Sequence, residues 1–486
     1  MAPSAPPPEA PSGPAASLVA RAARLPGVTR ARRLLSRFVP PGAILLTVLT
    51  FGGYLMGLVR DRTFARTYGA GIELDAYNAA FVLPELLLDV LVASGLTAPF
   101  VPIYLGLRQD DETAADDFGR TVLTVATLVM AGCAAVLFVV APWTASVIVP
   151  GFDAAHQALY VELFRIMCLT PILFAASIAL GEVLVADRRF LTYGLAPLLY
   201  NGGIVLGTVL LSDRLGIKAA AVGAVLGAAA HLGIRLLGVL RAGFPVRARL
   251  AVRTAAFREF VRLMLPKMAS QPIEPLTFLF YTAVATTIGA GAVSSVSFAR
   301  NFQSVPVSLI GVSFSIAVFP ALSSAWAAGE RRRFAGLLAT NVATIAALTI
   351  AAGIGLAVVG EVAIGVLLGG GAFDQAAIER TALVLSVFAI SVPLESLTYP
   401  LARALYATRN TILQVAASVA GLAALVVACL ALVDPLGIVA IPLSFAIGQA
   451  VKLVVLSLAI AARMRTGQPG GADSSGWVGT VGTTAM

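Results

Sequence analysis

The chain has 486 residues, of which 58% are hydrophobic and 12% are charged, and its formal net charge is +9 at pH 7. A soluble domain has about 25% charged residues, so this composition excludes a globule surrounded by water. It predicts an all-α polytopic membrane protein, because backbone that crosses lipid must satisfy its own hydrogen bonds. The positive balance does not imply a nucleic-acid partner, since arginine-rich loops on one side of a membrane produce the same balance.

The first 40 residues differ in composition from the rest of the chain. Residues 1–20 are rich in alanine and proline and contain no apolar core long enough for a signal peptide, so we expect disorder. Residues 21–37 hold six arginines spaced among apolar residues. This pattern predicts either an amphipathic segment on an anionic leaflet or a plain basic flank of the first helix.

Apolar segments long enough to span a bilayer recur about twelve times along the chain. They lie at roughly 42–60, 75–106, 119–142, 158–186, 193–212, 217–240, 260–288, 292–326, 336–360, 377–407, 411–433 and 436–462. The loops on the side of the N-terminus hold most of the arginines. This bias predicts that both termini are cytoplasmic.

The two halves of the chain share a pattern. A GAG turn at 69–71 is followed by Pro84, and a second GAG turn at 289–291 is followed by Pro306. Six spans in each half imply parallel repeats related by a pseudo-two-fold axis along the membrane normal, with a central cavity between the two bundles. The predicted division is a disordered or basic segment at 1–40, a six-helix bundle at 41–240, a cytoplasmic linker at 241–259, a second six-helix bundle at 260–465 and a disordered tail at 466–486.

The stretch Gly53–Tyr104 embeds charged side chains in apolar helices. Such a group costs about 2.5–3.5 kcal/mol at a helix centre on insertion scales, so it tends to face a cavity or a partner. Arg60 is predicted either to face a cavity or to anchor the outer interface. Arg62 and Arg66 are expected to pair with acids or headgroups, or to contact a substrate. Asp75 follows a glycine turn and is predicted either to cap a helix or to latch the two halves together.

Further charges lie within later helices. Arg300 follows Gly291 by nine residues, which places it about 14 Å into the bilayer by helical rise. Four acidic residues are also expected in mid-helix positions: Glu85, Asp89, Glu274 and Glu395. They are predicted either to form structural ion pairs with Arg300, Lys452 or Arg403, or to couple transport to an ion.

The stretch GLVRDRTFARTYGAGIELDAYNAAFVLP at 57–84 resembles the signature of the lipid II flippases, the MurJ/MviN family of the multidrug/oligosaccharidyl-lipid/polysaccharide exporter superfamily. Other pieces agree in order with the family pattern: Pro150–Phe152, Arg189–Phe190, Ala196–Pro197, Asn201, Phe319–Ser323, Gly371–Asp374 and Ala404–Ala407. The resemblance runs over roughly residues 45–465. Each piece is a weak signal, and the order and spacing of the set are more specific.

This resemblance implies a flippase that moves lipid II, a polyprenyl-diphosphate-linked peptidoglycan precursor, across the bacterial cytoplasmic membrane by alternating access. No covalent chemistry, and therefore no catalytic residue, is expected. No metal site is expected either, because the chain has only two histidines and three dispersed cysteines. The implied partners are membrane lipids and the lipid-linked glycan, and cell-wall synthesis enzymes stay open as partners. No cofactor is expected, although a coupling ion (H⁺ or Na⁺) or the membrane potential stays open as the driving force. The implied substrate-binding residues are Arg60, Asp61, Arg66, Asp75, Arg300 and Asn301.

The chain departs from the family pattern at several basic positions. Tyr54 stands where the family has another first-helix arginine, and Leu88 and Asp89 occupy its basic positions on the second helix. Ala93 replaces a nearby glutamate, and the Asp-Arg pair of the eighth helix reads Arg300–Asn301. Counterparts of helices thirteen and fourteen, which form a lipid-tail groove in the family, are not found. These departures leave the substrate open.

Two other functions are compatible with the sequence. The mid-helix acids favour an ion-coupled exporter of small organic cations within the same superfamily. The lost arginines and helices favour a relative that acts as a scaffold and does not transport.

Overall fold

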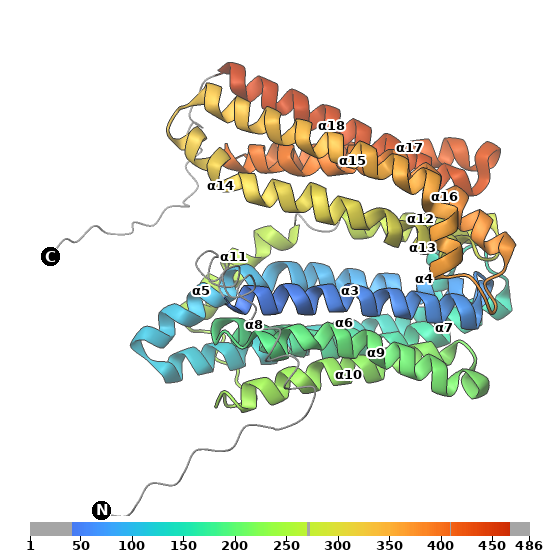
Figure 1. Ribbon diagram of the computed structural model, residues 1–486. Coiled ribbons are helices and arrows are strands. Elements are labelled where there is room, and N and C mark those ends of the chain that lie inside the picture. Colours follow the sequence, from blue (N-terminus) through green and yellow to red (C-terminus); the bar gives the residue numbers. More distant parts are fainter. Residues whose placement is uncertain (1–40, 270–272, 409, 467–486) are drawn as a thin grey trace, which may run out of the picture.

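The computed structural model describes residues 41–269, 273–408 and 410–466, and within these ranges the secondary structure is helical, with no strand. The predicted disordered segments lie outside the described residues, apart from Thr466. Figure 1 shows two stacked bundles of long helices, the first half of the chain in one and the second half in the other.

The helices of the N-terminal bundle are α3 (Pro41–Tyr68), α4 (Ile72–Leu88), α5 (Ser94–Asp110), α6 (Glu112–Ile148), α7 (Ala154–Met167), α8 (Leu169–Ala186), α9 (Phe190–Leu215) and α10 (Lys218–Leu240). Those of the C-terminal bundle are α12 (Ile273–Ile288), α13 (Ala292–Pro306), α14 (Ser313–Ala327), α15 (Arg331–Leu367), α16 (Gln375–Ala407), α17 (Ile412–Leu436) and α18 (Ala440–Thr466). Two π-helical segments continue the chain between helices, Asp89–Ala93 from α4 to α5 and Val307–Val312 from α13 to α14.

Each predicted apolar segment except the seventh coincides with one of these helices or with consecutive helices. Within the described ranges, nine stretches are long and apolar enough to cross a membrane on length and composition alone. The predicted all-α polytopic architecture is therefore confirmed. The two π-helical segments occupy corresponding places in the two halves, shortly after Pro84 and directly after Pro306. An inner proline removes one backbone donor, and a widened turn accommodates this loss.

The seventh predicted segment differs from the structure. The sequence predicts one apolar helix at 260–288, whereas the chain forms α11 (Ala255–Ala269) and α12 as separate helices. Phe257 and Phe260 on α11 are buried in the core of the N-terminal bundle. Their burial explains why α11 begins inside the predicted linker and packs on the first bundle rather than continuing into the second.

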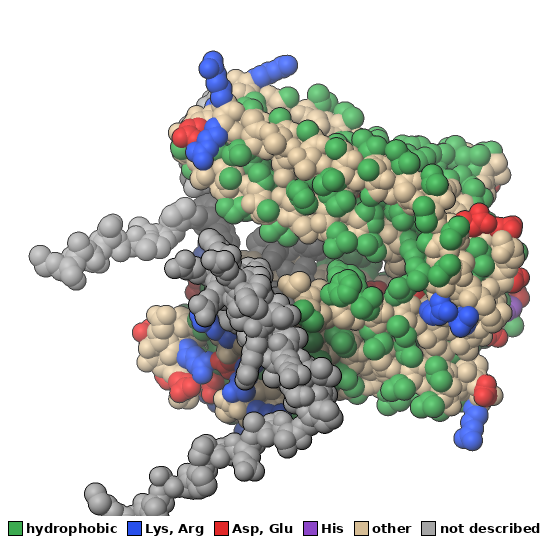
Figure 2. Space-filling view, viewed as in Figure 1, with side chains coloured by type: hydrophobic (Ala, Val, Ile, Leu, Met, Phe, Trp, Pro, Cys, Tyr) green, Lys and Arg blue, Asp and Glu red, His purple; other side chains and the backbone are tan. Residues whose placement is uncertain are grey.

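Among the described residues, the bundles share a buried core at one end only. Leu74 of α4 and Phe373, in the loop between α15 and α16, belong to one buried cluster that joins the two halves. Away from this end each bundle has its own core, around Phe100 in the first and around Phe334 in the second. We call the shared end, where α3 meets α4 and α15 meets α16, the closed end. We call the opposite end the open end, and Figure 2 shows a gap between the bundles near the middle of the molecule.

Figure 2 also shows hydrophobic side chains spread over the flanks of both bundles, while charged side chains gather toward the two ends. Many large apolar residues are exposed on these flanks, including Val147, Leu210, Val358 and Val427. In water such an apolar surface would be a site of association. In a bilayer it is the surface that contacts lipid, which agrees with the polytopic architecture.

Candidate functional site

Two cavities lie between the bundles. The smaller has a volume of about 360 Å³ and is lined by Arg60, Asp61, Arg300 and Asn301. The larger, of about 840 Å³, extends toward the open end. Glu85 lines both, so the two cavities adjoin. The structure therefore brings four of the predicted substrate-binding residues together, in the position that a central cavity requires.

Arg60 lies near the closed end of α3 and its guanidinium is held by two neighbours. Its Nε and Nη2 donate to Oδ1 of Asp61 at 3.1 and 2.8 Å, and its Nη1 donates to Oδ1 of Asn201 at 3.1 Å. The other carboxylate oxygen of Asp61 accepts a hydrogen bond from Asn301 at 2.8 Å. Asn301 is on α13, so a continuous polar chain crosses from one bundle to the other through the smaller cavity.

Arg300 is held more tightly than Arg60. Its two terminal nitrogens donate to the two carboxylate oxygens of Glu395 on α16, at 2.8 and 2.9 Å. The side chains of this pair are only 13% and 6% exposed. Gln303, one turn along α13, donates to Glu395 at 2.9 Å and accepts a hydrogen bond from Arg300. The guanidinium carbon also lies 4.9 Å from the ring centre of Phe445, within the range of a cation–π contact.

The remaining predicted acids line the larger cavity. Oε1 of Glu274 on α12 lies 3.6 Å from Nη2 of Arg300, so two of the four acids pair with that arginine. Glu85 and Asp89 lie one helical turn apart on the N-terminal wall, and both are exposed to the cavity. Neither forms an ion pair within the described ranges. The structural role that the sequence left open thus applies to Glu395 and Glu274 and not to Glu85 and Asp89.

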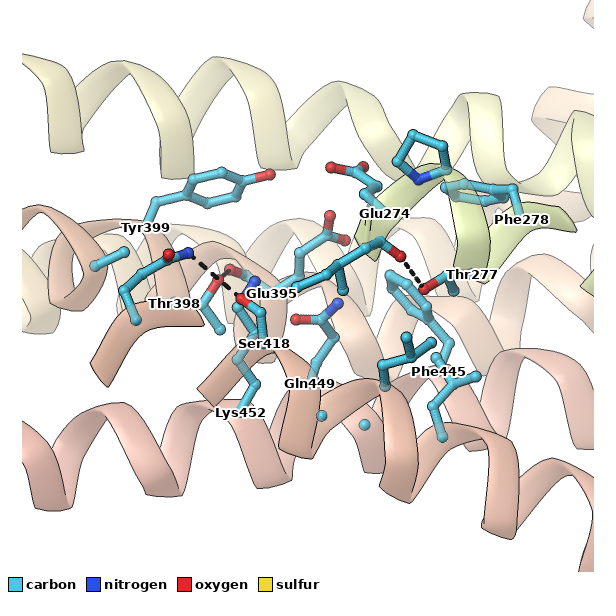
Figure 3. A pocket seen from close by; sticks show the side chains of 18 of the residues that line it. Glu274, Thr277, Phe278, Glu395, Thr398, Tyr399, Ser418, Phe445, Gln449 and Lys452 are labelled. Carbon is cyan, nitrogen blue, oxygen red and sulfur yellow. Dashed lines mark hydrogen bonds between the residues drawn. The ribbon is translucent and has the colours of Figure 1, made fainter. Parts of the chain in front are cut away.

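The larger cavity also contains two cations on its C-terminal wall, Arg403 on α16 and Lys452 on α18. Figure 3 shows Lys452, Gln449 and Phe445 on one side, with Glu274 and Tyr399 across from them. The sequence identified Lys452 and Arg403 only as partners for the acids, and neither forms an ion pair with a described residue.

Asp75 and Arg66 lie at the closed end and line neither cavity. The carboxylate of Asp75 accepts hydrogen bonds from the backbone nitrogens of Gly291 and Ser294, at 2.6 and 2.7 Å, and from the Ser294 hydroxyl at 2.6 Å. Asp75 therefore caps α13 of the opposite half, where a negative charge also suits the helix dipole. The predicted cap of its own helix is wrong, because Gly71 stands at the N-cap of α4 and Asp75 lies within the first turn. Its bonds across the interface agree with the predicted latch, and the structure does not place it with the substrate-binding set.

Three arginines at the closed end bind backbone carbonyls of the C-terminal half, Arg62 and Arg66 from the opposite half and Arg380 from within it. Arg62 donates to the carbonyls of residues 366 and 367, both at 2.7 Å, where α15 ends. Arg66 donates to the carbonyl of residue 369 at 3.2 Å, and Arg380 on α16 donates to that of residue 290 at 2.6 Å. A cation beside the last carbonyls of a helix complements its dipole. These arginines are among the few basic residues on the side that the predicted charge bias leaves poor in arginine, and their bonds to carbonyls explain their place there.

Two side chains of the site were not predicted as binding residues. In the sequence, Asn201 stands out only as part of a motif, and Gln303 only by its spacing of one turn from Arg300. A polar residue one turn from an intramembrane arginine is close enough to bond the same acid as the arginine does. The partner itself, 92 residues away in the case of Gln303, is fixed by the tertiary fold.

The sequence was compared with known proteins. Residues 64–483 match the protein family described as Lipid II flippase MurJ. A probable lipid II flippase MurJ of Thermotoga maritima is 27% identical over 362 residues, which cover 74% of this chain and 72% of that protein. A probable lipid II flippase MurJ of Borreliella burgdorferi is 22% identical over 349 residues, covering 72% of this chain and 69% of that protein.

Solved structures share the fold. A lipid II flippase MurJ in an inward closed conformation superposes with a TM-score of 0.75 at 20% identity, covering 86% of this chain and 87% of that one. An inward-facing multidrug resistance MATE family transporter of the MOP superfamily gives a TM-score of 0.71 at 14% identity, covering 86% and 96%. These likenesses concern the fold, and the family match covers most of the sequence. The chain belongs to the lipid II flippase MurJ family.

Proposed function

We propose that this protein is a flippase for lipid II, a polyprenyl-diphosphate-linked peptidoglycan precursor, in the bacterial cytoplasmic membrane. Its diphosphate-sugar head group cannot cross about 30 Å of hydrocarbon unaided, so transport requires a polar compartment within the membrane. The observation that carries the proposal is the pair of adjoining cavities between the bundles, which contain basic groups and end at a sealed closed end.

The transport cycle follows from this arrangement. The head group enters the larger cavity from the open end, which faces the cytoplasm if both termini are cytoplasmic, while the polyprenyl chain stays in lipid. Separation of the closed-end contacts then exposes the cavity to the other side. No covalent bond changes, so the protein needs no catalytic group. It needs two conformations that bind the substrate with different affinities.

Growth of cells depleted of their native flippase tests the proposal. We expect the unaltered chain to support growth and Arg60→Gln to fail, because the variant loses the cation that faces the smaller cavity. Arg332→Gln is the matched control, since Arg332 is an exposed arginine at the start of α15 that lines neither cavity. Immunoblots of membranes establish equal abundance. Full growth with Arg60→Gln, or none with the unaltered chain, would contradict the proposal.

Glu85 and Asp89 favour a second candidate, an ion-coupled exporter of small organic cations. They are acidic, exposed to the larger cavity and not paired with a cation among the described residues. An efflux assay with a fluorescent organic cation separates the candidates. Efflux that Glu85→Gln abolishes would favour the exporter, whereas its absence in a chain that supports growth would favour the flippase.

A further inference from the structure

Two of the arginines that the sequence predicts as binding residues, Arg60 and Arg300, already bind side chains of the protein. Both terminal nitrogens of Arg300 bond Glu395 in a buried pair, and Arg60 bonds Asp61 and Asn201. An incoming phosphate would have to displace a carboxylate from Arg300 and leave that carboxylate buried without its cation, which is unfavourable. Neither arginine is therefore the first cation available to an anionic group.

Lys452 and Arg403 are in the opposite situation. Both line the larger cavity, and neither forms a hydrogen bond or an ion pair with another residue in the described parts of the chain. The two acids that line this cavity from the C-terminal bundle, Glu274 and Glu395, are both paired with Arg300. A charged group in a membrane-embedded cavity that is not paired within the protein is expected to serve a ligand or an ion pathway.

The surrounding helices hold both cations in place. The Cβ of Lys452 lies 3.0 Å from the position a Cβ would occupy at Gly421, so α17 packs directly against the stem of this lysine. The guanidinium carbon of Arg403 lies 5.6 Å from the ring centre of Phe319 on α14. A guanidinium over a ring face keeps its N–H groups at its edge available for oxygen ligands.

The two cations lie at similar depth. Arg403 follows Glu395 by eight residues on α16, about 12 Å nearer the open end by helical rise. Lys452 follows Phe445 by seven residues on α18, about 10 Å nearer the open end. A head group that enters from the open end therefore meets Lys452 and Arg403 before it reaches Arg300.

The charge across the cavity points to the same wall. Glu85 and Asp89 expose their side chains to the larger cavity from the N-terminal bundle. Like charges repel an anion from that wall, so phosphate oxygens are favoured against the C-terminal wall, where the unpaired cations lie.

We propose that Lys452 and Arg403 form the first phosphate-binding pair of the cavity, with Lys452 as a compact point charge and Arg403 as a planar two-pronged donor. The assignment rests on the proposed function, because it takes the cargo to be a lipid diphosphate. It places the initial binding step on the C-terminal bundle and assigns Arg300 and Glu395 to holding α13 and α16 together.

Binding of undecaprenyl diphosphate to the full chain in nanodiscs, followed by native mass spectrometry, tests the assignment. We expect Lys452→Gln and Arg403→Gln each to raise the dissociation constant by about tenfold or more, as loss of a charge-assisted hydrogen bond does. Lys452→Arg should keep near-normal affinity because it retains the charge. Arg332→Gln should bind as the unaltered chain does, and inorganic diphosphate should compete if the phosphate groups carry the recognition.

The outcomes separate this assignment from the proposed function. If the unaltered chain binds and the double variant Lys452→Gln/Arg403→Gln binds equally well, the assignment is overturned and the proposed function stands. If the unaltered chain binds undecaprenol with the same affinity as undecaprenyl diphosphate, the cations do not recognise the phosphates and the assignment again fails. If it retains no lipid diphosphate, the proposed function falls together with the assignment. Thermal unfolding midpoints equal to that of the unaltered chain show that the variants are folded.

Discussion

At the scale of single residues, the pair Arg300–Glu395 shows why an intramembrane charge does not by itself identify a binding residue. The two side chains bond each other through two parallel hydrogen bonds and are almost fully buried. Removing one member of such a pair costs about 3–5 kcal/mol, because the other charge is left buried without a partner. Replacing both by apolar residues of similar size is often neutral.

This reasoning predicts the behaviour of a double-mutant cycle. Arg300→Met should lower the free energy of unfolding by about 3–5 kcal/mol, and Arg300→Met/Glu395→Met should recover most of that loss. Denaturant unfolding in detergent micelles measures both variants. If the double variant is as unstable as the single one, the pair does not act as a structural unit and Arg300 needs another explanation.

The sequence could predict that these charges face a partner or a cavity, because lipid excludes the alternative. It could not choose between the two for Arg300, since its partner Glu395 lies 95 residues away and is brought near only by the packing of α13 on α16. Lys452 carried even less information, because its place in the cavity depends on the packing of α17 against α18.

At the scale of elements, the two GAG turns, which indicate the repeat in the sequence, also form contacts between the two halves in the structure. A Cβ at Gly291 would lie 2.1 Å from the carbonyl oxygen of Ala70, and one at Gly69 would lie 2.5 Å from that of Ala372. Both glycines also have positive φ, +81° and +68°. Gly69 and Gly291 are therefore required for two reasons: their backbone conformation and the close approach of the opposite half.

This contact predicts different effects for two glycine substitutions. Gly291→Ala should push the halves apart at the closed end, whereas Gly243→Ala, at φ +86° with no neighbouring atom within 4 Å, should affect only its own turn. Spin labels at Arg214→Cys and Ala376→Cys, in a chain without its three native cysteines, report the separation across the closed end. We expect a longer distance with Gly291→Ala and no change with Gly243→Ala. Equal distances in both would show that Gly291 does not hold the halves in contact.

The apolar segments were predictable because their length and hydropathy are local properties. The division of the seventh segment was not, since it depends on Phe257 and Phe260 finding a core in the N-terminal bundle. The repeat was visible in the GAG turns and prolines, but the meeting of those turns is a property of the assembled halves.

At the scale of the whole molecule, a shared core closes one end and the cavities extend toward the other. If both termini are cytoplasmic, as the arginine bias predicts, the cavity is accessible from the cytoplasm.

Site-directed thiol labelling checks this orientation. In a background without native cysteines, Tyr406→Cys should react with a membrane-impermeant reagent in inside-out vesicles, because Tyr406 lines the larger cavity and is 40% exposed. Glu73→Cys, on the exposed face of α4 at the closed end, should react only in intact spheroplasts. The reverse pattern would place the termini outside and contradict the predicted topology.

The closed-end contacts have a consequence for the evolution of this protein. Asp75, Arg62 and Arg66 all bond main-chain atoms of the opposite half. Apart from the further bond between Asp75 and the Ser294 hydroxyl, only one member of each of these contacts is a side chain. A substitution at residues 366, 367 or 369 leaves the accepting carbonyl in place, and no second substitution is needed to restore the bond. Correlated changes between the two halves would therefore be nearly silent at this interface, and contacts inferred from sequence covariation would understate how firmly it is joined.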